Sequence, residues 1–220
     1  MKVLTSRTED RETLQDLGRA SIQIVHDLKN QLNGLKLYAT FLRRRLEKSE
    51  RPEDEQETIV KLIAGLDRAA SDLTTIVEYG REIELKKQPG FEVQKLLRTV
   101  CSSFHGPETQ IVVDASSDSV QGELDPLKLT DAFKWISTAA IKNRLTDKDD
   151  RPITVTISST NDDAATIEWS VLKKLDHDPF RSFVGSDEIR LALAAKIIEA
   201  HGGSATLADD RFVVQLPLSG

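Results

Sequence analysis

Between residues 14 and 77 the apolar side chains recur with the period of an α-helix, and this pattern constrains the fold more than any other feature. The steps are mostly three or four residues, as an amphipathic helix requires. A polar break at residues 49–55, which contains Pro52, separates two such runs. The first run consists of Leu14, Leu17, Ile24, Leu28, Leu32, Leu35, Ala39, Leu42 and Leu46, and the second of Ile59, Ile63, Leu66, Ala70, Leu73 and Val77.

Two long helices joined by a short loop form an antiparallel hairpin. One hairpin buries only a single apolar stripe, whereas two hairpins together bury both. The pattern therefore predicts a homodimer built around a four-helix bundle. The alternative is a solitary helical spacer, in which the same aliphatic stripe still serves as core.

His26 lies inside the first helical run but points away from its apolar seam. It stands two residues from Ile24 and two from Leu28, which places it on the opposite face at about 100° per residue. Asp27 follows directly. The residues that share the face of His26 are Ile22, Lys29, Asn30 and Asn33.

These neighbours suit a histidine that carries a phosphoryl group. An imidazole that attacks phosphorus must be neutral, and a carboxylate such as Asp27 can fix its tautomer and act as general base. Asn30, one turn further on, can orient a water molecule or a phosphoryl oxygen. Lys29 adds positive charge where a phosphoryl group or an acidic partner approaches. A surface histidine without a special role remains the simpler interpretation of any single histidine.

The string His26 to Asn33, H-D-L-K-N-Q-L-N, resembles the phosphoacceptor box of two-component histidine kinases and histidine phosphotransferases. The resemblance implies that His26 lies on the first helix of a dimeric four-helix bundle. It matches Asp27 to the family's acid, and Asn30 to the Thr or Asn that the family ties to dephosphorylation of the response regulator. Gln31 replaces the usual proline.

A junction at residues 85–90, with two lysines, a proline and a glycine, separates a domain 1–85 from a domain 86–220. Beyond it the pattern becomes mixed, and a sheet covered on one face by helices is the natural architecture. The fold class is therefore α+β. The predicted helices are 91–104, 125–143 and 186–201, and the predicted strands are 110–115, 153–158, 166–172, 205–207 and 212–216.

The order of these elements resembles the ATP-binding domain of the same kinases, a Bergerat-like α/β sandwich. Residues 191–203 are similar to the last helix and turn of that domain, and residues 125–129, D-P-L-K-L, to the start of its asparagine-box helix. With the helical hairpin, the resemblance covers nearly the whole chain.

Three departures from the kinase pattern predict that this domain is degenerate. Trp135 and Ala139 stand where the family places its amides, and neither offers an oxygen to magnesium. No D-x-G-x-G string occurs in the chain. The glycine-rich box keeps Gly185, but Glu188 and Arg190 replace glycines where phosphates touch bare backbone, and Glu188 also repels them. The sequence thus predicts no bound nucleotide, no autokinase activity and no cofactor.

Composition limits the other function classes. The formal net charge is -6 with both signs well mixed among the 220 residues, which argues against nonspecific nucleic-acid binding. A single cysteine, Cys101, excludes an intramolecular disulfide and is typical of a reducing compartment. No apolar run approaches a membrane span, and no signal-peptide core is present. We expect a cytoplasmic protein without a membrane partner.

The function predicted from the sequence is that of a histidine phosphotransferase in a two-component phosphorelay. His26 would pass a phosphoryl group between response-regulator receiver domains, with Mg²⁺ supplied by the receiver and an upstream hybrid kinase as a further partner. Three alternatives stay open. They are a receiver phosphatase that depends on Asn30, a non-catalytic protein that binds a receiver or a kinase, and a divergent active kinase.

Overall fold

The computed structural model describes residues 25, 28–44, 53–104, 111–115, 120–147, 152–160, 164–171, 175, 177–183 and 185–218. The chain divides into two compact units, Met1–Glu82 and Ile83–Gly220. His26, Asp27 and Ile22 lie outside the described residues. None of the helices within the described ranges is both long and apolar enough to cross a bilayer.

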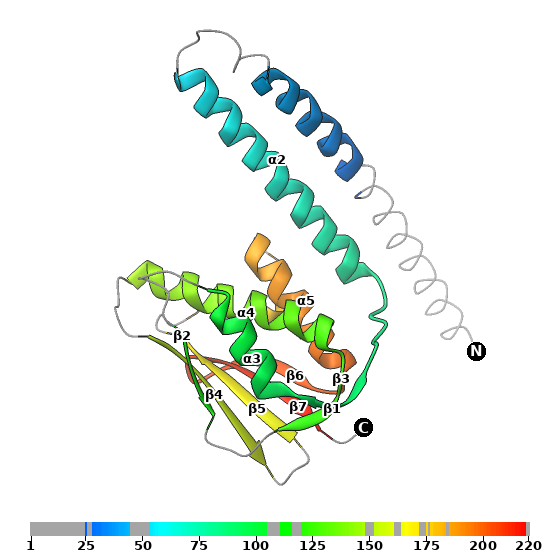
Figure 1. Ribbon diagram of the computed structural model, residues 1–220, viewed down its shortest axis with the longest axis vertical. Coiled ribbons are helices and arrows are strands. Elements are labelled where there is room, and N and C mark those ends of the chain that lie inside the picture. Colours follow the sequence, from blue (N-terminus) through cyan, green and yellow to red (C-terminus); the bar gives the residue numbers. More distant parts are fainter. Residues whose placement is uncertain are drawn as a thin grey trace, which may run out of the picture. The chain divides into compact units, whose positions relative to one another are not determined.

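The described residues of the first unit form two helices that lie side by side and run in opposite directions (Figure 1). One spans residues 28–44, and the other is α2, Glu53–Gly80. Ala39 is only 3% exposed, and Lys36 forms an ion pair with Asp67 across the two helices. The apolar run of α2 faces inward, since every one of its members is half-buried or buried. A four-helix bundle of two copies remains a prediction.

The second unit is built on a five-stranded sheet of order β2-β4-β5-β7-β6. Its strands are β2 (Ile111–Ala115), β4 (Ile153–Thr160), β5 (Ala164–Ser170), β6 (Ser204–Ala208) and β7 (Arg211–Pro217). β2 pairs with β4 in parallel, and all other neighbours are antiparallel. Strict alternation of side chains makes one face apolar and the other polar.

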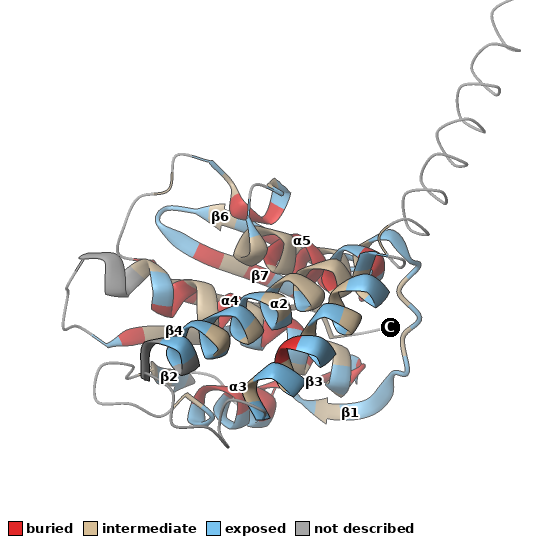
Figure 2. Ribbon diagram, turned by 90° about the horizontal axis from the view of Figure 1, so that it is seen from above, coloured by how far each residue is buried: buried red, intermediate tan, exposed pale blue. Residues whose placement is uncertain are grey.

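Three helices cover the apolar face of this sheet (Figures 1 and 2). They are α3 (Val93–Ser102), α4 (Pro126–Asp147) and α5 (Ser186–Ala200). Trp169 of β5 is fully buried and packs its ring 5.7 Å from that of Phe133 on α4. Its indole N–H donates to the hydroxyl of Ser137, 3.0 Å away, which also contacts the thiol of Cys101 on α3. This network joins two helices to the centre of the sheet.

A second, two-stranded sheet of β1 (Gln88–Glu92) and β3 (Gln121–Leu124) corrects the sequence-based assignment. The predicted helix 91–104 begins only at Val93, because Phe91 pairs with Gly122 in this ladder. Gly90 adopts a φ of 63°, which a larger residue rarely tolerates, at an irregularity of the ladder. Both strands are short and carry glycine and charged residues, so their period-two signal is too weak to detect.

Candidate functional site

The helix over residues 28–44 carries the described part of the predicted phosphoacceptor face. Asn30 and Asn33 are exposed on it, and Lys29 is half-buried. Since the backbone is helical through these positions, Asn30 and Asn33 lie about 60° apart around the axis and share one side. The two asparagines are therefore exposed on the side of the helix that the sequence assigns to the phosphoacceptor face.

The same helix exposes an unusual amount of apolar surface. Leu28, Leu35 and Leu42 are 45%, 54% and 53% exposed, and they repeat every seven residues. Leu37 and Phe41 are 55% and 58% exposed on a different side of the helix, the side of Asn30. The helical unit thus offers two separate apolar surfaces in the single chain.

In the α/β unit, Asp125 organises the start of α4. Its Oδ1 accepts from the backbone N–H of Leu127 at 3.0 Å and of Lys128 at 3.1 Å, so it caps the helix. Its Oδ2 accepts from the N–H of Lys86, 2.7 Å away, which ties down the segment that enters this unit. Burial opposes ionisation of this carboxyl, but the three backbone donors outweigh it and lower its pKa.

His201 holds the backbone of Asp125 from the end of α5. Its Nε2 accepts from the N–H of Asp125 at 3.0 Å, and its Nδ1 donates to the carbonyl of Ile197 at 2.8 Å. The ring is therefore neutral with its proton on Nδ1. Burial lowers the pKa of His201 and outweighs the opposing effects of Ile197 and Asp125. This histidine has a structural role at the helix end.

Trp135 and Ala139, which the sequence resemblance matches to the kinase amides, are half-buried on α4. One turn further along, the ammonium of Lys142 donates to both carboxylate oxygens of Asp187 on α5, each at 2.7 Å. Arg190 lies 3.8 Å from the same carboxylate. Both cations near the head of α5 therefore have an internal anion as partner.

The N-terminus of α5 begins at Gly185, whose φ of -156° is extended, and no side chain caps it. A helix N-terminus attracts anions because its free N–H groups carry partial positive charge. Asp187 and Glu188 supply that negative charge from the first turn itself. Glu188 also accepts a hydrogen bond from the hydroxyl of Ser182 and lies 3.0 Å from Nε2 of His177.

A short 3₁₀-helix, η1 (Pro179–Arg181), precedes the head of α5 and is not among the elements predicted from the sequence. Asp178 caps it by accepting from the N–H of Phe180 at 3.0 Å. Pro179 and Phe180 are buried, and the ring of Phe180 meets that of Phe212 edge-on at 5.5 Å. The string D-P-F, an N-cap residue followed by proline, was the available signal.

Two positions on α4 carry no side-chain oxygen that could ligate a metal ion. Magnesium requires oxygen ligands, which Trp135 and Ala139 lack. Among the residues that the structure describes, no three His, Cys, Asp or Glu side chains gather to hold a metal. Asp187 and Glu188 place two carboxylates in the first turn of α5.

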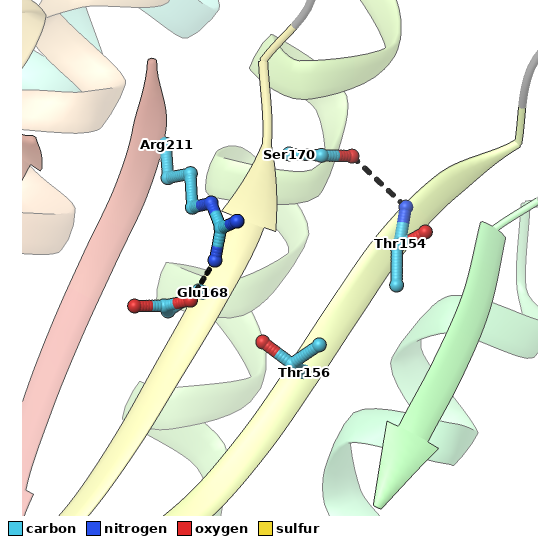
Figure 3. A pocket seen from close by; sticks show the side chains of 5 residues that line it. All are labelled: Thr154, Thr156, Glu168, Ser170 and Arg211. Atoms are coloured by element: carbon cyan, nitrogen blue, oxygen red, sulfur yellow. Dashed lines mark hydrogen bonds and ion pairs between the residues drawn. The ribbon is translucent and has the colours of Figure 1, made fainter. Parts of the chain in front are cut away.

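The polar face of the five-stranded sheet carries a separate hollow of about 280 Å³ (Figure 3). Glu168 and Arg211 form an ion pair across β5 and β7 at its side, and the N–H of Thr154 donates to the hydroxyl of Ser170 at 3.0 Å. The lining residues are Thr154, Thr156, Glu168, Ser170 and Arg211. Its charged groups satisfy each other.

No protein-family model matches the chain, and no curated protein matches it. Solved structures do. Full-length ShkA in complex with AMPPNP superposes with a TM-score of 0.71 at 18% identity, covering 89% of this chain and 44% of that one. The histidine kinase AdeS of Acinetobacter baumannii gives 0.57 at 14% identity over 86% and 95% of the two chains.

The nucleotide-free catalytic domain of the histidine kinase ThkA gives a TM-score of 0.50 at 16% identity, over 62% of this chain and 99% of that domain. The chain spans less than half the length of ShkA. At these identities the likeness is one of fold. The chain has a mixed α/β fold similar to histidine kinases, including their catalytic domain.

Proposed function

We propose that this protein is a histidine phosphotransferase of a two-component phosphorelay that works without a nucleotide. The observation that carries the proposal is the contrast between its two units. The helix that carries the second part of the phosphoacceptor string exposes Asn30 and Asn33, whereas the α/β unit has acids and apolar side chains at the positions that the resemblance matches to nucleotide-binding residues. The phosphoryl donor is therefore a phosphorylated receiver domain.

In the proposed reaction a neutral nitrogen of His26 attacks the phosphorus of an aspartyl phosphate on the donor receiver. The new P–N bond forms as the P–O bond to the donor carboxylate breaks. Asp27 accepts a hydrogen bond from the other ring nitrogen and stabilises the charge that develops on the imidazole. The reverse step on a second receiver regenerates the free histidine. Magnesium comes with the receiver.

The exposed stripe of Leu28, Leu35 and Leu42 supports dimerisation. The intervening positions of the same apolar run, Leu32 and Ala39, are half-buried and buried within one chain. The three leucines of the stripe remain exposed in the single chain. A heptad spacing of large apolar residues is the pattern that packs against another helix. A second copy of the hairpin would bury this stripe and complete the bundle.

Leu37 and Phe41 serve a different partner in this proposal. They lie more than about 100° around the helix from the Leu35 stripe, and they share the side of Asn30. A homodimer that buries the heptad stripe leaves them exposed. An apolar patch beside a phosphoacceptor face suits the docking of a receiver domain, and Lys29 and Asn33 with Ile22 would orient it.

The two surfaces can be separated by a matched pair of substitutions. Leu35→Glu should convert a dimer into a monomer, because a buried unpaired carboxylate costs several kcal/mol. Leu37→Glu should leave the molar mass unchanged and weaken receiver-dependent labelling. Multi-angle light scattering measures the mass. A Leu35→Glu protein with the mass of the wild type would contradict the assigned dimer surface.

The function itself is tested by offering the purified protein radiolabelled ATP alone and then a panel of phosphorylated receivers. The wild type should take label only from a receiver, and His26→Ala should take none. Glu57→Gln, a change of an exposed carboxyl on α2, is the control and should behave as the wild type. Label from ATP alone would show an active kinase.

Receiver phosphatase activity is the second candidate, favoured by the exposure of Asn30 one turn after His26. An amide there can position the water that attacks an aspartyl phosphate. In that case His26→Ala keeps the loss of receiver phosphate while Asn30→Ala removes it. If neither activity is found while receiver binding persists, the protein is a non-catalytic binding partner.

A further inference from the structure

We propose that residues 177–183 form a strap that is permanently fastened across the head of α5, with Phe180 as its anchor and Glu188 as its clasp, so that this helix N-terminus is closed to phosphate-bearing ligands. The inference rests on the proposed function, because it supplies a physical reason why this unit works without a nucleotide.

The anchor is the short helix η1. Phe180 is 2% exposed, and its ring lies edge-on to that of Phe212, a geometry that favours aromatic pairs. Asp178 fixes the start of η1 through the N–H of Phe180, and the N–H of Arg181 donates to the carbonyl of Asp178 at 3.2 Å. A segment with a buried aromatic side chain and a capped helical turn opens only at a substantial free-energy cost.

The clasp is the carboxylate of Glu188 in the first turn of α5. One oxygen accepts from the hydroxyl of Ser182, and the other lies 3.0 Å from Nε2 of His177. Hydrogen bonds to an ionised acceptor are roughly twice as strong as neutral ones. One side chain of α5 therefore holds the strap at two points, five residues apart.

A third tie lies outside the clasp. The guanidinium of Arg181 reaches Glu199, near the end of α5, at 2.8 Å. This pair is exposed, with 63% and 43% of the two side chains accessible, so its contribution is small. It supplies a matched control, because Glu199 is a second glutamate of the same helix that also pairs with the strap.

The electrostatics at the helix head agree with a closed site. Two carboxylates, Asp187 and Glu188, lie at the positive end of the α5 dipole. Among the described residues near this helix head, Lys142 pairs with Asp187 and Arg190 lies 3.8 Å from the same carboxylate. An incoming phosphate would have to displace an internal carboxylate and meet a second one. The chain thus supplies its own anion in place of a ligand.

Hydrogen exchange of the full-length protein, followed by mass spectrometry, tests the strap. The amides of residues 177–183 should be protected in the wild type and should exchange about tenfold faster in Glu188→Gln, because a neutral amide is a weaker acceptor than a carboxylate for both Ser182 and His177. Glu199→Gln should change their exchange by less than about twofold. Phe180→Ala should expose the segment further.

Adding ATP with magnesium should leave the exchange of the wild-type strap and of the α5 head unchanged. The proposal is overturned by equal strap exchange in the wild type and in Glu188→Gln, or by protection of the α5 head on addition of ATP. Labelling of His26 by a receiver is a separate readout. If no label reaches His26 while the exchange of the strap responds as described, the proposed relay function is refuted and the proposed strap is supported.

Discussion

His201 connects the end of α5 to the start of α4, and its removal tests how much this connection stabilises the α/β unit. It is 3% exposed, and its Nε2 is the acceptor for the buried N–H of Asp125. His201→Ala leaves that N–H without a partner, at a cost of about 1–3 kcal/mol. The lost imidazole leaves a cavity worth about 1–2 kcal/mol more. The carbonyl of Ile197 keeps the backbone N–H of His201.

We therefore expect His201→Ala to lower the free energy of unfolding of this unit by about 3 kcal/mol at pH 7. His201→Gln is the matched variant, because its amide supplies both an acceptor and a donor but does not titrate. Urea unfolding followed by circular dichroism measures both changes. A loss below about 0.5 kcal/mol for His201→Ala would refute the coupling.

The pH dependence gives a second, independent check on His201. Burial lowers its pKa in the folded protein, so the unfolded chain binds the proton more readily. Stability due to neutral His201 is therefore complete above about pH 6.5, the pKa of an unperturbed histidine, and is lost as the pH falls below it. One proton contributes at most about 1.4 kcal/mol per pH unit. His201→Gln should lack this part of the decline.

Three further predictions concern the α/β unit. Gly203→Ala should destabilise it by about 3 kcal/mol, since the added Cβ would lie 2.1 Å from the carbonyl oxygen of Gln215. Thermal unfolding measures this loss, and Gly185→Ala, whose Cβ would meet open space, is the control and should cost less than about 1 kcal/mol. Burial raises the pKa of Cys101 to about 11, so that at pH 8 only about one thiol in 1000 is ionised. Labelling by a thiol reagent should therefore be at least about a hundredfold slower in the native protein than in the urea-unfolded protein. Asp125→Asn should remove stability present above about pH 3.9, because the folded-state pKa of Asp125 is lowered and the wild type loses this contribution only as the pH falls through it; a variant with the acid-unfolding profile of the wild type would contradict this.

Periodicity alone was enough to assign the long elements, because burial of one helix stripe or one strand face leaves a repeating mark in the sequence. The helices α4 and α5 and the strands of the five-stranded sheet end within a few residues of where the pattern places them. Asp125 was also recognisable as a helix cap from its place before Pro126. These features depend on neighbours a few residues away.

The short elements and the fastening of α5 depend on contacts between distant residues, which no local pattern records. β1 and β3 stabilise each other across about 30 positions, and each is too short to show a period. Lys142 and Asp187 are 45 residues apart, so the sequence shows two ordinary charges on two helices. The sequence shows that Glu188 replaces a glycine of the family's phosphate-binding pattern. Its contacts with Ser182 and His177 form only because the chain turns back through η1. The sequence by itself determined which glycines and amides of the kinase pattern this unit lacks, because such a difference is visible without any tertiary contact. Only the tertiary structure decided which side chains contact one another at the head of α5, because salt bridges and buried aromatic pairs form between residues that are distant in the sequence.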